Sequence, residues 1–364
     1  MKSIWTCFVL GIVLTPVIAR QEFTSVAKTP LPVARNLFVI TVDGFRWQEL
    51  FNGADSSILH SEKYTPDHST ISLQYWAASA KERREKLMPF FWKVIAAKGQ
   101  VFGNRRLHNK VDAANLYSLS YPGYNEMFTG KTDMQISSNR KKRNPNINVF
   151  EYLNGQPDFT GKVAVFSSWD VFPYILNSER NGLPVNSGYV ATEGETDAQQ
   201  LINTVQRETI TDKKSTRYDQ LTFLAAREYL QINKPRVFCL GLGETDEYAH
   251  DGRYDLYLQQ ASQVDRMIAD LWHWVQTTPG YKNNTTFIIT TDHGRGSRTG
   301  NWTSHGEFIS GSSQAWFAVM GPGIEPAGEI KSDEQHYLQQ LAQTMAGVVG
   351  QEFKPAEAPA IALH

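Results

Sequence analysis

Short, nearly continuous apolar runs recur along the chain and alternate with segments of helical periodicity. Three runs have the length and β-branched content of strands buried on both faces: 36–42, 235–242 and 287–291. A further strand is predicted at 162–166, and apolar residues recur with helical spacing in 89–98, 120–130, 196–207, 218–232, 255–277 and 335–348. This alternation predicts an α/β fold, a three-layer α/β/α sandwich with a mostly parallel central sheet.

The first 19 residues have the pattern of a secretory signal peptide. Lys2 precedes an apolar run over 4–18, and Val17-Ile18-Ala19 suits cleavage after Ala19. We therefore predict an exported protein, periplasmic or secreted. No other run is long and apolar enough to cross a bilayer, so we expect no membrane association after cleavage.

The rest of the chain shows no internal repeat and no linker that would divide it. Residues 20–35 are predicted to be an irregular lead-in, and 36–364 a single catalytic domain. The segment at about 131–197 is the least regular, so we expect a cap-like insertion there that helps to select the substrate. Cys239 is the only cysteine left after cleavage, so the fold cannot depend on an internal disulfide.

Charge composition narrows the possible partners. The chain has 36 basic and 37 acidic residues, and no basic field that would indicate a nucleic-acid-binding surface. We therefore expect a small-molecule ligand. Oligomeric state is not indicated by the sequence.

Metal-competent side chains follow the three buried runs, at the points where strands open into loops. One motif is D-x-x-x-H, and another is Asp-His-Gly. The carboxyl ends of parallel strands meet at one edge of a sheet, so these groups can converge. Histidine nitrogen together with carboxylate oxygen suits zinc or manganese better than calcium or magnesium. The candidate ligands are Asp43, Asp246, His250, Asp292, His293 and His305.

These motifs, in this order, resemble the alkaline phosphatase superfamily. The resemblance is strongest to the nucleotide pyrophosphatase/phosphodiesterase and cofactor-independent phosphoglycerate mutase branches. Those families have a Ser or Thr nucleophile at a helix start, which Ser120-Tyr121-Pro122, followed by Thr129-Gly130, resembles. The match departs from the diesterase pattern at Tyr124, which falls one place early. From the residues alone, Ser120 could equally be a helix N-cap.

The resemblance implies an alkaline-phosphatase-like fold with two divalent cations, most simply Zn²⁺, with Mn²⁺ as the alternative. One ion would be held by Asp246, His250 and His305, and the other by Asp43, Asp292, His293 and the Ser120 oxygen. Ser120 would attack a phosphate ester and become a phosphoserine. Backbone N–H groups at the start of the following helix would face the phosphate. Monoester and diester substrates both remain open.

Substrate contacts are less well defined by the sequence. In the diesterase branch an Asn downstream of the nucleophile contacts a phosphate oxygen, and Asn139 and Asn144 both fit. Some monoesterase branches place a Lys and an Arg after the next strand, whereas the stretch 167–170 has neither. Trp169 in that stretch could stack on a substrate or belong to the core.

Three alternatives remain beside a phosphate ester hydrolase. A sulfatase of this superfamily would need Arg at the position of Tyr124. A phosphoglycerate mutase would carry a large second domain between Ser120 and Asp246, and that interval is short. The third is a non-catalytic protein that binds a glycan or another ligand on the same scaffold.

Overall fold

A computed structural model describes residues 31–194, 196–209, 211 and 213–363. The predicted signal peptide, and the lead-in as far as residue 30, lie outside the described residues. The strands are β1 (Asn36–Val42), β2 (Gln100–Phe102), β3 (Lys110–Asp112), β4 (Val163–Ser167), β5 (Val185–Ser187), β6 (Val237–Leu242), β7 (Thr285–Thr290), β8 (Gln314–Ala315), β9 (Phe317–Met320), β10 (Gly328–Glu329) and β11 (Gln335–Tyr337).

The helices occur between these strands, most of them in the segments with helical periodicity. They are α1 (Trp47–Asn52), α2 (Ser56–Leu59), α3 (His68–Tyr75), α4 (Ala80–Leu87), the π-helix η1 (Phe91–Ile95), α5 (Ala96–Lys98), the 3₁₀-helix η2 (Arg105–Leu107), α6 (Ser120–Thr129), α7 (Val149–Asn154), α8 (Phe172–Ile175), α9 (Ser178–Asn181), α10 (Asp197–Glu208), α11 (Asp219–Asn233), α12 (Glu244–His250), α13 (Tyr254–Thr277) and α14 (Gln340–Gly347).

An eight-stranded sheet forms the centre of the structure, in the order β10-β2-β9-β7-β1-β6-β4-β5. Strands β7, β1, β6, β4 and β5 are parallel to one another, whereas β9 is antiparallel to both β7 and β2. A small second sheet has the order β11-β3-β8. The predicted fold class is confirmed: an α/β sandwich with a mostly parallel central sheet.

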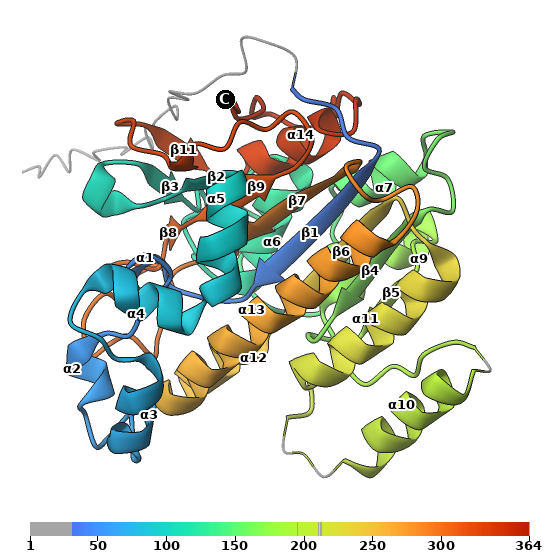
Figure 1. Cartoon of the computed structure of the whole chain (residues 1–364). Helices are drawn as coiled ribbons and strands as arrows, with labels where there is room; N and C mark the ends of the chain where they lie inside the picture. The colour runs from blue at the N-terminus through green and yellow to red at the C-terminus, as the bar shows by residue number, and fades with distance from the viewer. Residues whose placement is uncertain (1–30, 195, 210, 212, 364) are drawn as a thin grey trace, which may run out of the picture.

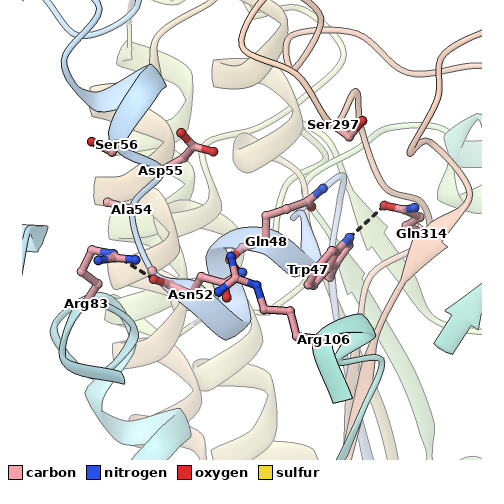
Figure 2. Close-up of a pocket in the computed structure, with 11 residues that line it drawn as sticks. Trp47, Gln48, Asn52, Ala54, Asp55, Ser56, Arg83, Arg106, Ser297 and Gln314 are labelled. Atoms are coloured by element: carbon pink, nitrogen blue, oxygen red, sulfur yellow. Dashed lines mark hydrogen bonds between the residues drawn. The ribbon is translucent and has the colours of Figure 1, made fainter. Parts of the chain in front are cut away.

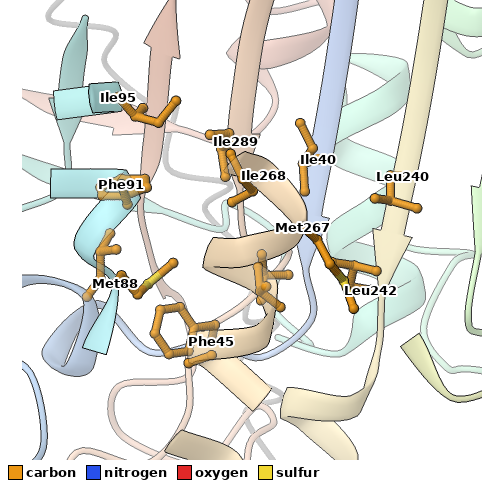
Figure 3. Close-up of a cluster of buried hydrophobic side chains, with 14 of the residues drawn as sticks. Ile40, Phe45, Met88, Phe91, Ile95, Leu240, Leu242, Met267, Ile268 and Ile289 are labelled. Atoms are coloured by element: carbon orange, nitrogen blue, oxygen red, sulfur yellow. The ribbon is translucent and has the colours of Figure 1, made fainter. Parts of the chain in front are cut away.

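Helices cover both faces of the central sheet, because the side chains of the central strands are buried on alternate faces. Phe38, Ile40 and Val42 of β1 pack into a core with α13, α11, α4 and η1. Leu37 and Val39 pack on the opposite face with α6, α7 and α14. Figure 1 shows α13 and α11 crossing in front of the strands and α6 behind them. Figure 3 shows the first core, where Met267 and Ile268 of α13 reach the strands.

Two local predictions are corrected by the structure. The segment 131–197 is not a cap set apart from the sheet, because it contains β4 and β5, the last two strands at one edge of the central sheet. Residues 335–337, predicted to open the last helix, form the strand β11 beside β3, and α14 begins only at Gln340. Within the described ranges, no helix has the length and hydropathy needed to cross a membrane.

Candidate active site

Three neighbouring strands carry the predicted ligands at their carboxyl ends. β7, β1 and β6 are adjacent and parallel, with Thr41 opposite both Thr290 and Gly241. Asp43 directly follows β1, Asp292 comes just after β7, and α12 begins just after β6. The strand ends therefore lie side by side, as the sequence predicted.

Asp43, Asp292 and His293 form a buried group that we call the inner cluster. Nε2 of His293 lies 3.4 Å from Oδ1 of Asp43 and 3.4 Å from Oδ2 of Asp292. Nδ1 of His293 lies 2.8 Å from the carbonyl oxygen of Gly294, which can only accept a hydrogen bond. The proton is therefore assigned to Nδ1, and Nε2 presents its lone pair to the cluster.

Asp246, His250 and His305 form the outer cluster. His250 lies one turn after Asp246 on α12, with its Nε2 3.1 Å from Oδ2 of Asp246 and 3.0 Å from Nε2 of His305. Nδ1 of His305 donates to the carbonyl oxygen of Ser118 over 2.9 Å, so its Nε2 also presents a lone pair. The rings of His293 and His305 stack with centroids 3.9 Å apart, so the two clusters adjoin.

The residues of both clusters fit divalent cations. In each cluster, one ligand atom per residue lies within 4.8 Å of the others. Oδ2 of Asp292 is buried and has no hydrogen-bond partner among the described residues. Burial, and then repulsion from Asp43, raises the pKa of Asp292 well above its usual value, so an ionised Asp292 is costly without a cation. Burial also lowers the pKa of His305 to about 3, which keeps the imidazole in the neutral form that binds metals.

Ser120 lies against the inner cluster. Its Oγ is 3.1 Å from Nε2 of His293 and 3.4 Å from Oδ1 of Asp43. It is the first residue of α6 and not the N-cap, which is Leu119. A Cβ on Gly123 would lie 2.3 Å from the carbonyl oxygen of Asp292, so this glycine lets α6 pack directly on the inner-cluster loop.

The backbone N–H groups at the start of α6 were expected to face the phosphate, and most are already engaged. The Tyr121 N–H donates to Oδ1 of Asn139 over 3.0 Å, and Pro122 has no N–H. The Gly123 N–H donates to the carbonyl of Leu119 over 2.9 Å. The side chain of Asn139 offers a further donor, because its Nδ2 has no partner among the described residues.

A cavity of about 200 Å³ opens over Ser120. It decides between the two candidate asparagines, because Asn139 lines it whereas Asn144 is buried and donates to Oδ1 of Asn125 over 2.9 Å. Trp169 also lines the cavity and is therefore accessible to a ligand. The full lining is Asp43, Ser120, Asn139, Trp169, Thr216, Gly243, Asp246, Glu247 and His250.

Two side chains that support the ligands were missed by sequence reasoning. The hydroxyl of Tyr124 donates to Oδ2 of Asp43 over 3.2 Å. Nη1 of Arg295 donates to Oδ1 of Asp246. Burial opposes ionisation of Asp246, but the charge of Arg295 holds its pKa well below the usual range. In the sequence, Tyr124 stands out only as a departure from the diesterase motif. Arg295 is a charged residue that follows Asp-His-Gly, and such a residue is typical of a solvated loop.

A second, larger cavity lies apart from both clusters. It measures about 460 Å³ and opens between α1, Arg83 of α4 and the loop that carries Ser297. Figure 2 shows its polar lining, in which the indole N–H of Trp47 donates to Oε1 of Gln314 over 2.8 Å. None of the predicted site residues lines it, so the candidate chemistry is confined to the smaller cavity.

Solved structures with the same fold include a phosphatase, a protein described as a sulfatase and a phosphonate hydrolase. Wild-type alkaline phosphatase PafA is 12% identical, with a TM-score of 0.58 over 92% of this chain and 99% of that chain. A sulfatase described as putative, from Bacteroides thetaiotaomicron, is 13% identical, with a TM-score of 0.56 over 91% of this chain and 74% of that one. A phosphonate monoester hydrolase from Silicibacter pomeroyi is 13% identical, with a TM-score of 0.54 over 89% and 75%. A search of curated protein sequences found no match.

The fold and the paired clusters define a protein of the metalloenzyme class with an alkaline-phosphatase-like sandwich. The model of the metalloenzyme superfamily matches residues 189–351, a segment that contains all of the outer cluster together with Asp292 and His293. The matched segment is similar to this superfamily, and the fold of the described chain is alkaline-phosphatase-like.

Proposed function

We propose that this protein is an exported, metal-dependent hydrolase of phosphate esters in which Ser120 is the nucleophile. The observation that carries the proposal is the position of Ser120 Oγ, 3.1 Å from His293 and 3.4 Å from Asp43 at the base of an open cavity. Export follows from the pattern of residues 1–19 and remains a prediction.

The inner and outer clusters would each hold one divalent cation. Bound there, zinc or manganese would neutralise the buried carboxylates and lower the pKa of the Ser120 hydroxyl. Ser120 Oγ lies 3.1 Å from Nε2 of His293 and 3.4 Å from Oδ1 of Asp43, so it is near enough to these ligand atoms for a cation held by them to contact it as well.

The reaction proceeds in two displacements at phosphorus. Ser120 Oγ gives up its proton to solvent and bonds to phosphorus as the bond to the ester oxygen breaks, and the departing oxygen takes up a proton from solvent. A water oxygen then bonds to phosphorus as the bond from phosphorus to Oγ breaks, and a proton of that water passes to Oγ, which restores the serine. Asn139 supports both steps, since its free Nδ2 can donate to a phosphoryl oxygen while its Oδ1 is held by the N–H of Tyr121.

Phosphate is favoured over sulfate by one position in the nucleophile segment. Sulfatases of this superfamily mature a Cys or Ser in the sequence C/S-x-P-x-R, and the Arg position is here Tyr124. Tyr124 is buried and donates a neutral hydroxyl to Asp43, so the guanidinium of the sulfatase motif is missing at that position.

The test is hydrolysis of bis-p-nitrophenyl phosphate, p-nitrophenyl phosphate and p-nitrophenyl sulfate, with Zn²⁺ or Mn²⁺ present. Ser120→Ala and Asp292→Ala should abolish cleavage of the phosphate esters. Ser137→Ala, which removes an exposed hydroxyl from the neighbouring loop, should not. The ratio of diester to monoester cleavage assigns the substrate class. Cleavage of the sulfate alone, or activity that survives in Ser120→Ala, would overturn the proposal.

A further inference from the structure

Arg295 is a fully buried charged residue that the proposed reaction does not use. It lies two positions after His293, and none of its surface is exposed. All three guanidinium nitrogens have acceptors: Nη1 donates to Oδ1 of Asp246, Nε to the carbonyl of Trp302 over 3.0 Å, and Nη2 to the carbonyl of Thr303.

These three hydrogen bonds join separate parts of the outer cluster. Asp246 belongs to α12, whereas Trp302 and Thr303 lead directly to His305. A guanidinium is a planar group with donors in fixed directions, so one Arg295 side chain sets where the carboxylate and the segment before His305 lie relative to each other. The structure thus connects two cluster ligands through a residue that is not itself a ligand.

The backbone encloses this contact. Gly44 has a φ of +58°, and a Cβ there would lie 2.5 Å from Oδ1 of Asp246 and 2.9 Å from Nη1 of Arg295. The main chain after β1 therefore packs directly on the pair. Oδ2 of Asp246 lies 3.1 Å from Nε2 of His250, and Oδ1, which accepts from Arg295, lies 3.8 Å from Nε2 of His305. Both carboxylate oxygens therefore lie near the outer-cluster histidines, and Arg295 holds one of them in place.

We propose that Arg295 is a positioning residue for the outer cluster. It assembles Asp246 and His305 before a cation binds, and its hydrogen bond to Oδ1 fixes how the carboxylate of Asp246 faces that cation. The inference rests on the two-cation part of the proposed function and not on the identity of the substrate.

Charge and positioning predict opposite effects of removing Arg295, so they can be separated. A fixed positive charge beside a cation site opposes cation binding, and its removal should then tighten the site. Loss of a residue that orients a metal ligand typically weakens metal affinity by about 10–100-fold. The direction of the change therefore reports which effect dominates.

The experiment measures Zn²⁺ stoichiometry and affinity by competition with a chromophoric chelator, and the Tm of the metal-free protein. The variants are Arg295→Met, which removes charge and geometry, and Arg295→Lys, which keeps the charge alone. Arg298→Met, in the same loop but exposed, controls for loss of a charge. We expect both Arg295 variants to bind one of two Zn²⁺ ions roughly 10–100-fold more weakly and the other unchanged. Arg298→Met should match the wild type.

Three outcomes would overturn the inference. One is tighter binding by Arg295→Met with wild-type affinity in Arg295→Lys, which would assign the effect to charge. The second is equal weakening at both ions together with a large fall in Tm, which would assign Arg295 a general structural role. The third is unchanged affinity for both ions. A wild-type protein that binds no Zn²⁺ or Mn²⁺ would instead contradict the proposed function, and this inference with it.

Discussion

The hydroxyl of Tyr124 donates to Oδ2 of Asp43 over 3.2 Å, from a position on α6 one turn beyond Ser120. Burial, with the charges of Asp43 and Asp292, raises the pKa of Tyr124 well above its usual value, so the group stays a neutral donor. Tyr124→Phe should lower metal affinity at the inner cluster about 10-fold and change Tm little. Chelator competition checks this, with Tyr152→Phe as the control. An unaltered affinity would show that Asp43 does not need this donor.

Removal of the cations should destabilise the fold. Asp43 and Asp292 are buried side by side, and cations that bind only the folded state stabilise it by mass action. Dialysis against a chelator should lower Tm by roughly 5 °C or more, and excess Zn²⁺ should restore it. Scanning fluorimetry provides the measurement. Asp292→Asn should show a smaller change in Tm when the cations are removed, because the variant lacks one carboxylate ligand and the repulsion between Asp43 and Asp292. If metal-free and metal-loaded proteins melt together, the clusters hold no cation.

Glu126 should make stability depend on pH. It is buried in α6 and accepts hydrogen bonds from the N–H groups of Ala114 and Asn115, which precede Ser120. Burial raises the pKa of Glu126 from an ordinary 4.5 to about 7. Between these two pH values, Glu126 keeps its proton in the folded state and has lost it in the unfolded state. The contribution of protonated Glu126 to the free energy of unfolding is therefore complete below about pH 4.5, and it is lost as the pH rises through about 7.

Urea unfolding at several pH values tests this linkage against Glu126→Gln, which cannot ionise. The free energy of unfolding of the wild type, relative to the variant, should fall by up to about 3 kcal/mol across that range. A difference that stays constant with pH, or grows, would contradict the assigned direction of the pKa shift.

Gly123→Ala should separate the nucleophile from its cluster. The added methyl group would lie 2.3 Å from the carbonyl oxygen of Asp292, so α6 must shift. We expect a stability loss of about 1–3 kcal/mol and a fall in kcat of roughly 100-fold, because small displacements of reacting groups are costly. Gly300→Ala, where a Cβ would meet nothing within 4 Å, is the control. Full activity in Gly123→Ala would mean that Ser120 is not held by this contact.

Asn139 should matter for the chemical step. Asn139→Asp keeps an oxygen to accept from the N–H of Tyr121 but loses the Nδ2 donor, whereas Asn139→Ala loses both. Each should lower kcat/KM roughly 100-fold, the cost of removing one preorganised donor. Steady-state kinetics would show it, with the exposed Asn233→Ala as control. If kcat/KM falls only in Asn139→Ala, the role of Asn139 is to accept the hydrogen bond from α6 and not to donate to the substrate.

The sequence was sufficient to predict the site at the level of strands. Asp43, Asp246 and Asp292 each follow an apolar run, and parallel pairing brings such run ends together without further information. The elements missed were short. β5 is a three-residue strand with a polar centre, and β11 lies in a stretch whose apolar spacing fits a helix. Both are specified by their sheet neighbours and not by their own residues.

The remaining details depend on contacts that sequence spacing does not encode. Asn139 and Asn144 are equivalent by position, and only the packing of Asn144 on Asn125 removes it from the site. Arg295 resembles a solvated loop residue until its three acceptors are brought around it by the turn at 302–303. Tertiary structure therefore decides which polar residues support the ligands.

The arrangement of β1 between β6 and β7 has a consequence for how the chain matures. Asp43 is made early during synthesis, but its partners Asp292 and His293 come about 250 positions later, since the contact between Gly44 and Asp292 spans 248 residues. Until that late segment is made, β1 lacks its neighbour β7, and Asp43 lacks the other two residues of the inner cluster. A chain cut short before Asp292 therefore cannot complete either the inner cluster or, with it, the proposed cation site.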